Sequence, residues 1–225
     1  MRLGRRGSEL VRAFADFCMS RPSELSHRRS TGYASPGQGY PPDRRHRRAD
    51  RVYQVDTRSL RGNALFRPLN GYASTQRHNF DGWMSSSSDN GLSNSYAQLF
   101  RDGSIETVDA RMLHPEGRSI PIDLLETEVI DVVSKYLALL GQLGVDPPIV
   151  LMLTLMGVQG YTIPPPNAWG LKHPIDRDVL LVPAVEVERL DLDVPHVLRP
   201  AFDAIWQAGG YPGSQNYDEN GTRRA

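Results

Sequence analysis

The sequence predicts an α+β fold: an antiparallel sheet with a central hairpin and two packed helices, preceded by a disordered basic N-terminal arm. A basic stretch that is poor in aliphatic residues opens the chain. After it, β-prone and helical segments follow one another in blocks and do not alternate as they do in a doubly wound sheet. Asp102 and Gly103 stand between two β-prone runs, which is a signal for a tight hairpin.

Charge divides the chain into two parts. Residues 1–61 contain 14 arginines and 6 acidic residues, a net charge of +8, whereas residues 62–225 contain 12 basic and 20 acidic residues, a net charge of −8. We assign residues 1–51 to a disordered arm because residues 21–51 contain almost no aliphatic side chains. A second interpretation of residues 1–51 is a truncated or frame-shifted start, which rests on the same abrupt change of composition.

We expect the α+β domain to cover residues 52–212. Four serines followed by Asp-Asn-Gly, residues 85–91, predict a flexible surface loop. The stretch SYAQLFRDGSIETVDA, residues 95–110, then predicts a hairpin with a two-residue turn at Asp102 and Gly103. With that turn, the facing pairs are Phe100 with Ile105, Gln98 with Thr107, and Tyr96 with Asp109.

The second half of the domain contains both predicted helices. Apolar residues spaced by three and four predict a helix of about twenty residues from Asp123, with Glu126 completing a capping pair. The apolar segment 149–158 predicts a buried strand, and Pro183 marks the following strand as an edge or bulged strand. Pro195 begins a last helix, and we expect residues 213–225 to form a frayed tail.

Cysteine content, the length of the apolar runs and the absence of known motifs limit the cellular locations and ligands that we expect. Cys18 is the sole cysteine, so the chain cannot form an internal disulfide, and we expect a reducing, cytoplasmic location. The apolar run 149–158 is about half as long as a membrane span, so we expect no membrane contact. The sequence contains no GxGxxG, Walker, GxSxG or HExxH motif. We therefore expect neither a cofactor nor a sequence-local metal site.

His78, Asp81 and Asp109 are the candidate catalytic residues. A histidine near carboxylates can act as a general base or bind a divalent ion, as in a small nuclease or hydrolase. The alternative, which we favour, is a turn at His78–Gly82 in which Asn79 and Asp81 bond to the backbone while the neighbouring aromatic side chains are buried. For Glu126, Glu128 and Asp131 we likewise favour a solvated helix face over paired catalytic carboxylates.

Binding candidates lie outside this group. Arg44, Arg45, Arg47 and Arg48 form the densest basic cluster, which is typical of nucleic-acid contact and also of a solvated tail. Trp169, in a proline-rich loop, is the candidate exposed aromatic residue of a protein-interaction module. The partners that these features predict are nucleic acid through the basic arm, or a protein, including a second copy of the chain.

Four segments together suggest a family: HNFDGW, SYAQLFRDGSIETVDA, PPIVLMLTLMGVQGY and LRPAFDAIWQAGGYPGSQNYDENG. They resemble the region that follows the Schlafen-type, Alba-like DNA-binding domain in bacterial proteins described as ATP-binding. The resemblance covers Phe66 to Gly221 and implies a non-enzymatic accessory α+β domain of a regulatory or defence protein. It implies no catalytic residue in this region.

The chain also departs from this family. It lacks a segment that matches the preceding nucleic-acid-binding or ATP-binding domain, and an apolar strand expected just before Pro68 is missing. DNA or ATP binding by such relatives is therefore not carried over to this chain. The predicted function is an accessory domain, with a nuclease or hydrolase and a protein-interaction module as the alternatives.

Overall fold

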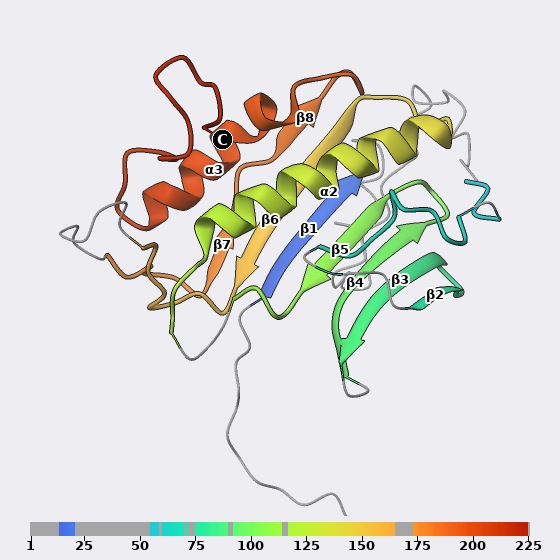
Figure 1. Ribbon diagram of the computed structural model, residues 1–225, viewed down its shortest axis with the longest axis horizontal. Coiled ribbons are helices and arrows are strands. Elements are labelled where there is room, and N and C mark those ends of the chain that lie inside the picture. The colour runs from blue at the N-terminus through green and yellow to red at the C-terminus, as the bar shows by residue number, and fades with distance from the viewer. Residues whose placement is uncertain are drawn as a thin grey trace, which may run out of the picture.

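The fold was analysed in a computed structural model, which describes residues 14–20, 55–58, 60–69, 71, 75–89, 92–113, 117–164 and 173–224. These residues form an α+β fold with an antiparallel sheet and two long helices, as the sequence predicts (Figure 1). The strands are β1 (Phe14–Ser20), β2 (Thr75–His78), β3 (Gly82–Asp89), β4 (Leu92–Phe100), β5 (Ile105–Asp109), β6 (Ile149–Met156), β7 (Val179–Leu181) and β8 (Val185–Val187). The helices are α2 (Ile122–Gln142) and α3 (Val194–Ala208).

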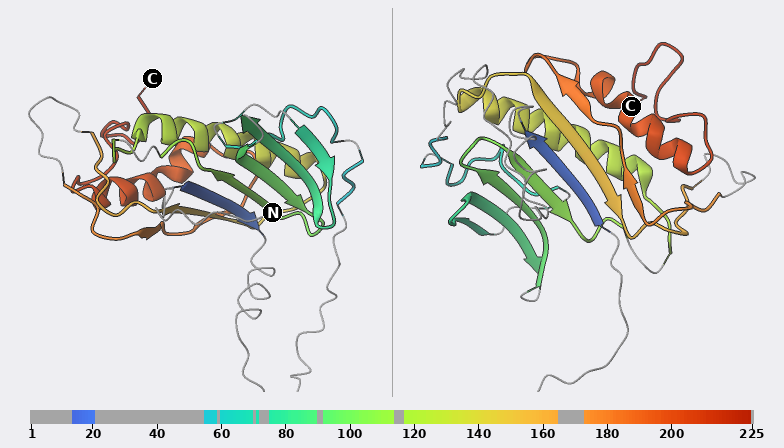
Figure 2. Two further views of the ribbon diagram at one scale, coloured as in Figure 1. Left: turned by 90° about the horizontal axis from the view of Figure 1, so that it is seen from below. Right: turned by 180° about the vertical axis from the view of Figure 1, so that it is seen from behind.

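The described strands form one sheet in the order β2-β3-β4-β5-β1-β6-β7, and β8 also pairs with β6. Helix α2 lies across one face of the sheet, and α3 packs beside α2 near β8 (Figures 1 and 2). One row of side chains shows how the core forms. Trp83, Leu99, Ile105, Met19 and Leu151 are in register on five adjacent strands, and each is at most 3% exposed.

Strand β1 corrects the prediction that residues 1–51 are a disordered arm. It pairs with β5 on one side, where Ala15 lies opposite Asp109. On the other side it pairs with β6, where Ser20 lies opposite Val150. The segment FADFCMS contains a single charged residue, and Met19 is fully buried. The charge of the whole arm concealed this short β-prone segment. The remainder of residues 1–51 lies outside the described residues.

The β4–β5 hairpin is present, but its register is one residue away from the prediction. Leu99 lies opposite Ile105, so the loop contains three residues and not two. Gly103 donates a backbone hydrogen bond to Phe100 at 3.1 Å and has φ +86°, and Phe100 donates one to Ser104 at 2.8 Å. This is a type I turn followed by a left-handed residue, which is common in three-residue hairpin loops. The one-residue shift places Leu99 and Ala97, and not Phe100 and Gln98, opposite Ile105 and Thr107.

The structure contradicts the prediction for the serines at 85–88 and confirms the one for the strand around Pro183. The serines at 85–88, expected in a flexible loop, belong to β3, whose partner β4 aligns Ser85 with Ala97. Ser85 is fully buried, so a run of serines does not prevent strand pairing in this sheet. The segment around Pro183 is divided into β7 and β8, which both pair with β6. This interruption confirms the expected edge or bulged strand.

A charged network fastens residues 60–69 to α2. One guanidinium nitrogen of Arg67 donates to Glu128 at 2.8 Å and also to Asp131, and Lys135 donates to Asp131 at 2.7 Å. The buried hydroxyl of Tyr136 donates to the backbone carbonyl of Arg67 at 2.6 Å. Burial raises the pKa of Tyr136 well above its usual range, so this hydroxyl remains a donor. Glu128 and Asp131 therefore do not only form a solvated helix face: both bind Arg67 and hold residues 60–69 against α2.

Replacing Met19 by Ala tests the central position of β1. We expect the free energy of unfolding to fall by about 2–5 kcal/mol, because a buried methionine leaves a cavity in the core row. Denaturant unfolding of the full chain measures this change. Leu181→Ala is the matched control: Leu181 is 78% exposed, and we expect a change within about 0.5 kcal/mol. Equal effects of the two substitutions contradict the placement of β1.

The Arg67 network predicts a pH dependence. Burial alone would raise the pKa of Asp131, but hydrogen bonds from Lys135 and Arg67 lower it below its ordinary value of 3.8. A lowered pKa stabilises the fold above the unfolded-state pKa and loses this effect as pH falls through the folded-state pKa. We expect Asp131→Asn to lower stability at pH 7 by no more than about 1 kcal/mol, because the carboxylate is partly exposed and screened.

The pH series of unfolding free energies for wild type and Asp131→Asn checks this expectation. The difference should shrink as pH falls below about 4, where the wild-type carboxyl also becomes neutral. A difference that stays constant down to acid pH would show that packing, and not charge, gives the effect.

Candidate functional site

The most unusual polar group of the described residues is Glu126, a fully buried carboxylate near the start of α2. The Trp206 indole nitrogen and the Ser214 hydroxyl each donate to its Oε1 at 2.8 Å, and the Asn216 amide donates to its Oε2 at 2.9 Å. Burying a carboxylate is costly unless donors replace water, and these three side chains provide that replacement. Glu126 therefore joins α2, α3 and the C-terminal segment.

This geometry corrects two predictions for Glu126. It does not lie on a solvated helix face, and α2 has no side-chain capping bond at its start. The sequence did contain a signal. Glu126 precedes Val129 by three residues and Val133 by seven, which places it on the same helix face as the apolar stripe. A charged residue in an apolar stripe indicates a buried group that needs partners.

The C-terminal segment is also ordered, which corrects the expected frayed tail at residues 213–225. Tyr217 is buried and its hydroxyl donates to the Pro195 carbonyl at 2.7 Å. Arg223 donates to the Thr127 hydroxyl at 2.8 Å. Burial first, and the negative charge of Glu126 second, raise the pKa of Tyr217. Residues 213–224 therefore pack on α2 and α3.

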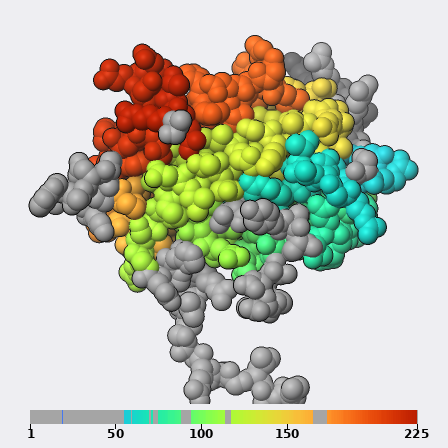
Figure 3. Space-filling model, in the orientation of Figure 1, coloured from blue at the N-terminus to red at the C-terminus, as the bar shows by residue number. Residues whose placement is uncertain are grey.

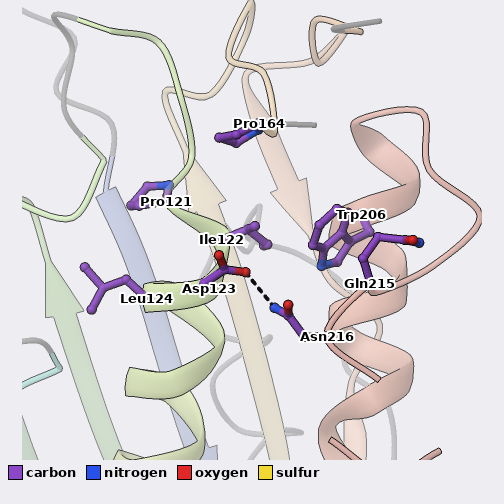
Figure 4. Close-up of a pocket in the computed structure, with 8 residues that line it drawn as sticks. All are labelled: Pro121, Ile122, Asp123, Leu124, Pro164, Trp206, Gln215 and Asn216. Carbon is purple, nitrogen blue, oxygen red and sulfur yellow. Dashed lines mark hydrogen bonds between the residues drawn. The ribbon is translucent and has the colours of Figure 1, made fainter. Parts of the chain in front are cut away.

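A pocket of about 480 Å³ lies where the C-terminal segment meets the start of α2. Figure 4 shows its lining: Pro121, Ile122, Asp123, Leu124, Pro164, Trp206, Gln215 and Asn216. On the surface, the C-terminal segment and the first turns of α2 lie side by side (Figure 3). This volume is within the range of about 300–1,000 Å³ that is usual for ligand pockets.

The pocket combines apolar side chains and prolines with two amide side chains, Gln215 and Asn216, and one carboxylate. Asp123 is exposed, and its Oδ1 accepts a hydrogen bond from the Asn216 amide at 2.9 Å (Figure 4). The same amide nitrogen donates to Glu126, so Asn216 fixes Asp123 relative to the buried carboxylate. A ligand that suits this lining has an apolar body and a positive or N–H-donating group.

The structure places His78 and Asp81 at the β2–β3 turn. Both are exposed. The imidazole of His78 packs edge-on against Trp83, with ring centroids 4.5 Å apart. The backbone carbonyl of Asp81 accepts a hydrogen bond from the Arg101 amide at 3.1 Å.

Asp109 is far from these two residues. It is fully buried at the end of β5, where its Oδ1 accepts backbone hydrogen bonds from Arg111 at 3.0 Å and Met112 at 2.6 Å. His78 is aligned through β3 and β4 with Ile105, four residues before Asp109. That separation is about 13 Å along the strand alone. The three candidate catalytic residues therefore do not converge.

The β2–β3 turn instead displays an aromatic residue. Asn79 bonds to the backbone as expected, since its Oδ1 accepts from the Gly82 amide at 2.8 Å, and Trp83 is buried. Phe80 contradicts the prediction that the aromatic side chains of this turn are buried, because it is 90% exposed. Its carbonyl accepts a hydrogen bond from Arg101 Nε at 3.0 Å. The turn is pinned by its backbone while the Phe80 ring projects outward.

Other candidates are not placed. Arg44, Arg45, Arg47, Arg48 and Trp169 lie outside the described residues. Within the described ranges, no cluster of three or more His, Cys, Asp or Glu residues is arranged to hold a metal ion. Neither α2 nor α3, the helices of the described part of the chain, has the length and apolar character needed to cross a membrane.

Comparison of the chain with protein-family models, curated proteins and solved structures finds no match. The similarity to the region after the Schlafen-type domain therefore stays a prediction.

Replacing Glu126 by Ala tests the buried carboxylate. We expect the free energy of unfolding to fall by about 3 kcal/mol, because the buried donors of Trp206 and Ser214 and the half-buried amide of Asn216 lose their acceptor. We also expect faster hydrogen exchange at Ser214 and Asn216, since the C-terminal segment is released from α2. Glu188→Ala, at an exposed carboxylate, is the control and should change stability by less than about 0.5 kcal/mol. Unchanged stability and exchange in Glu126→Ala contradict this role.

Proposed function

We propose that this chain is a non-enzymatic accessory domain that works by binding, and that the pocket at the start of α2 receives a side chain of a protein partner. The observation that carries this proposal is the pocket lining. Apolar side chains and prolines form one part of its lining, Gln215 and Asn216 form a polar part, and the Asp123 carboxylate is held in place by Asn216 (Figure 4). Such a site selects an apolar side chain that lies next to a positive charge.

The hydrogen bonds of two buried acidic side chains support binding, and not catalysis, as the function. Glu126 accepts three hydrogen bonds from side chains that hold the fold together, and Asp109 accepts two from the backbone. Carboxylates that serve as general acids or bases need access to a reacting group. These two are fully buried; the bonds of Glu126 join α2 to α3 and the C-terminal segment, and those of Asp109 hold the turn after β5.

Preorganisation also supports binding. The wall formed by Gln215 and Asn216 is fixed through Glu126 to α2, and Trp206 is fixed by the same carboxylate. Tyr211 packs edge-on against Trp206, with ring centroids 5.0 Å apart. A pocket whose lining is already ordered loses little conformational entropy when a ligand binds.

The resemblance to the Schlafen-associated region extends this proposal. It would make the chain an accessory domain of a regulatory or defence protein, in which binding brings components together. Nucleic-acid contact is a second candidate function, favoured by the net charge of +8 over residues 1–61. It would run through the basic arm, because the net charge of residues 62–225 is −8.

A peptide titration tests the pocket. The probe is a short capped peptide that carries a phenylalanine next to an arginine, and the readout is the indole N–H resonance of Trp206 in the full chain. We expect saturable shifts of this resonance and of the Asn216 amide, with a dissociation constant near 1 mM or below, equivalent to about −4 kcal/mol. Leu124→Arg should abolish the shifts, whereas Leu181→Arg, at an exposed site on β7, should preserve them.

Two outcomes of this titration would count against the proposal. One is the absence of saturable shifts in wild type. The other is equal shifts in Leu124→Arg, because the peptide would then bind elsewhere.

A salt-dependent titration tests the second candidate. Removing residues 1–51 would also remove β1, so the sharper variant replaces Arg44, Arg45, Arg47 and Arg48 by Gln in the full chain. We expect wild type to bind double-stranded DNA nonspecifically, with affinity that falls steeply as salt rises. The substituted chain should bind more weakly and with a shallower salt dependence. Identical titrations for both chains would exclude a role for this cluster.

A further inference from the structure

We propose that the pocket receives the Phe80 turn of a second copy of the chain, so that molecules associate head to tail. This inference rests on the proposed function, because it names the partner of the same pocket. It starts from two features that the fold leaves complementary: one displayed aromatic side chain and one apolar pocket with an acidic group. The two features come from different ends of the domain.

The Phe80 turn, residues 79–82, is built to hold its shape. The Asn79 backbone amide donates to the Gly82 carbonyl at 3.0 Å, and the Gly82 amide donates to Asn79 Oδ1 at 2.8 Å. Arg101 adds bonds from its Nε to the Phe80 carbonyl and from its amide to the Asp81 carbonyl. Gly82 is required at its position, since a Cβ there would lie 2.2 Å from the Leu99 carbonyl oxygen. A ring presented on such a turn loses little backbone freedom on binding.

The turn carries charge next to its aromatic ring. Arg101 is exposed and its guanidinium bonds to the Phe80 backbone carbonyl, so a positive group is held against the backbone of the residue that carries the exposed ring. Asp81 is also exposed and gives the turn a negative group. Two opposite charges on one turn favour a single docking orientation, in which Arg101 faces an acidic partner and Asp81 faces solvent.

The pocket has the matching properties. Its volume of about 480 Å³ accommodates a phenylalanine side chain, and Leu124, 43% exposed, forms part of an apolar wall. Asp123 provides the acidic group that would face Arg101 (Figure 4). Aromatic and arginine residues are enriched at interfaces, where an aromatic anchor in a pocket gives much of the binding energy.

The location of the two features makes the contact intermolecular. Strands β2 and β3 lie on one side of the molecule, and the start of α2 with the C-terminal segment lies on the other (Figures 1 and 2). The turn of one chain therefore does not reach its own pocket. A contact between two different surfaces is heterologous, so each added molecule leaves one free turn and one free pocket.

Sedimentation velocity of the full chain over a series of concentrations tests this arrangement. We expect wild type to form species larger than dimers as concentration rises. Phe80→Asp and Leu124→Arg should each be monomeric, because each lacks one of the two surfaces. An equimolar mixture of these two variants should form a dimer and nothing larger, since one variant retains the pocket and the other retains the turn. Leu181→Arg should associate like wild type.

Circular dichroism of each variant establishes that loss of association is not loss of folding, and Phe80→Ala with Leu124→Ala provides a milder pair with the same expectation. A wild type that stays monomeric at all concentrations overturns the inference, as does association that either substitution leaves intact. So does a mixture of the two variants that remains monomeric. If the peptide still shifts Trp206 in a monomeric wild type, the pocket binds another partner and the proposed function survives.

Discussion

The fold depends on the pairing of β1 with both β5 and β6. Without it, β2 to β5 would form one sheet and β6 to β8 another, each with an open edge where hydrogen-bonding groups need partners. Met19 also completes the core row between Ile105 and Leu151, so β1 supplies both backbone pairing and apolar contact. Helix α2 can cover a continuous sheet only because this strand closes the gap (Figure 1).

A second constraint, the burial of Glu126, organises the opposite side of the domain. A single carboxylate positions Trp206 on α3 together with Ser214 and Asn216 of the C-terminal segment. All three donors bond to one side chain, so its removal would leave three polar groups without this acceptor. The pocket depends in part on this arrangement: two of its lining residues, Trp206 and Asn216, are bonded to Glu126, and its acidic group, Asp123, is bound by the same Asn216.

Sequence periodicity predicted those elements in which one pattern dominates. The spacing of Leu125, Val129 and Val133 predicted α2, and the apolar run at 149–158 predicted β6, which ends at Met156, because each helix or strand places its apolar residues on a buried face. The hairpin register was wrong because Asp-Gly is compatible with loops of two and of three residues, and only the core packing of Leu99 and Ile105 selects one.

The candidate site was less predictable, for reasons that also follow from physics. Glu126 lies in an apolar stripe, but its partners are 80 or more residues away in sequence, and no local pattern reveals them. The exposure of Phe80 contradicts the usual tendency of aromatic residues to be buried, so composition alone favoured burial. The basic arm was judged by its average charge, which hides a seven-residue strand.

The place of β1 in the sheet also bears on how the protein is made. Among the described strands β1 is synthesised before the others, yet both of its neighbours, β5 and β6, are synthesised much later, β6 ending at Met156. Its pairing with β5 can form only after Asp109 has been made and its pairing with β6 only after Met156, so a nascent chain carries β1 without its neighbours until then.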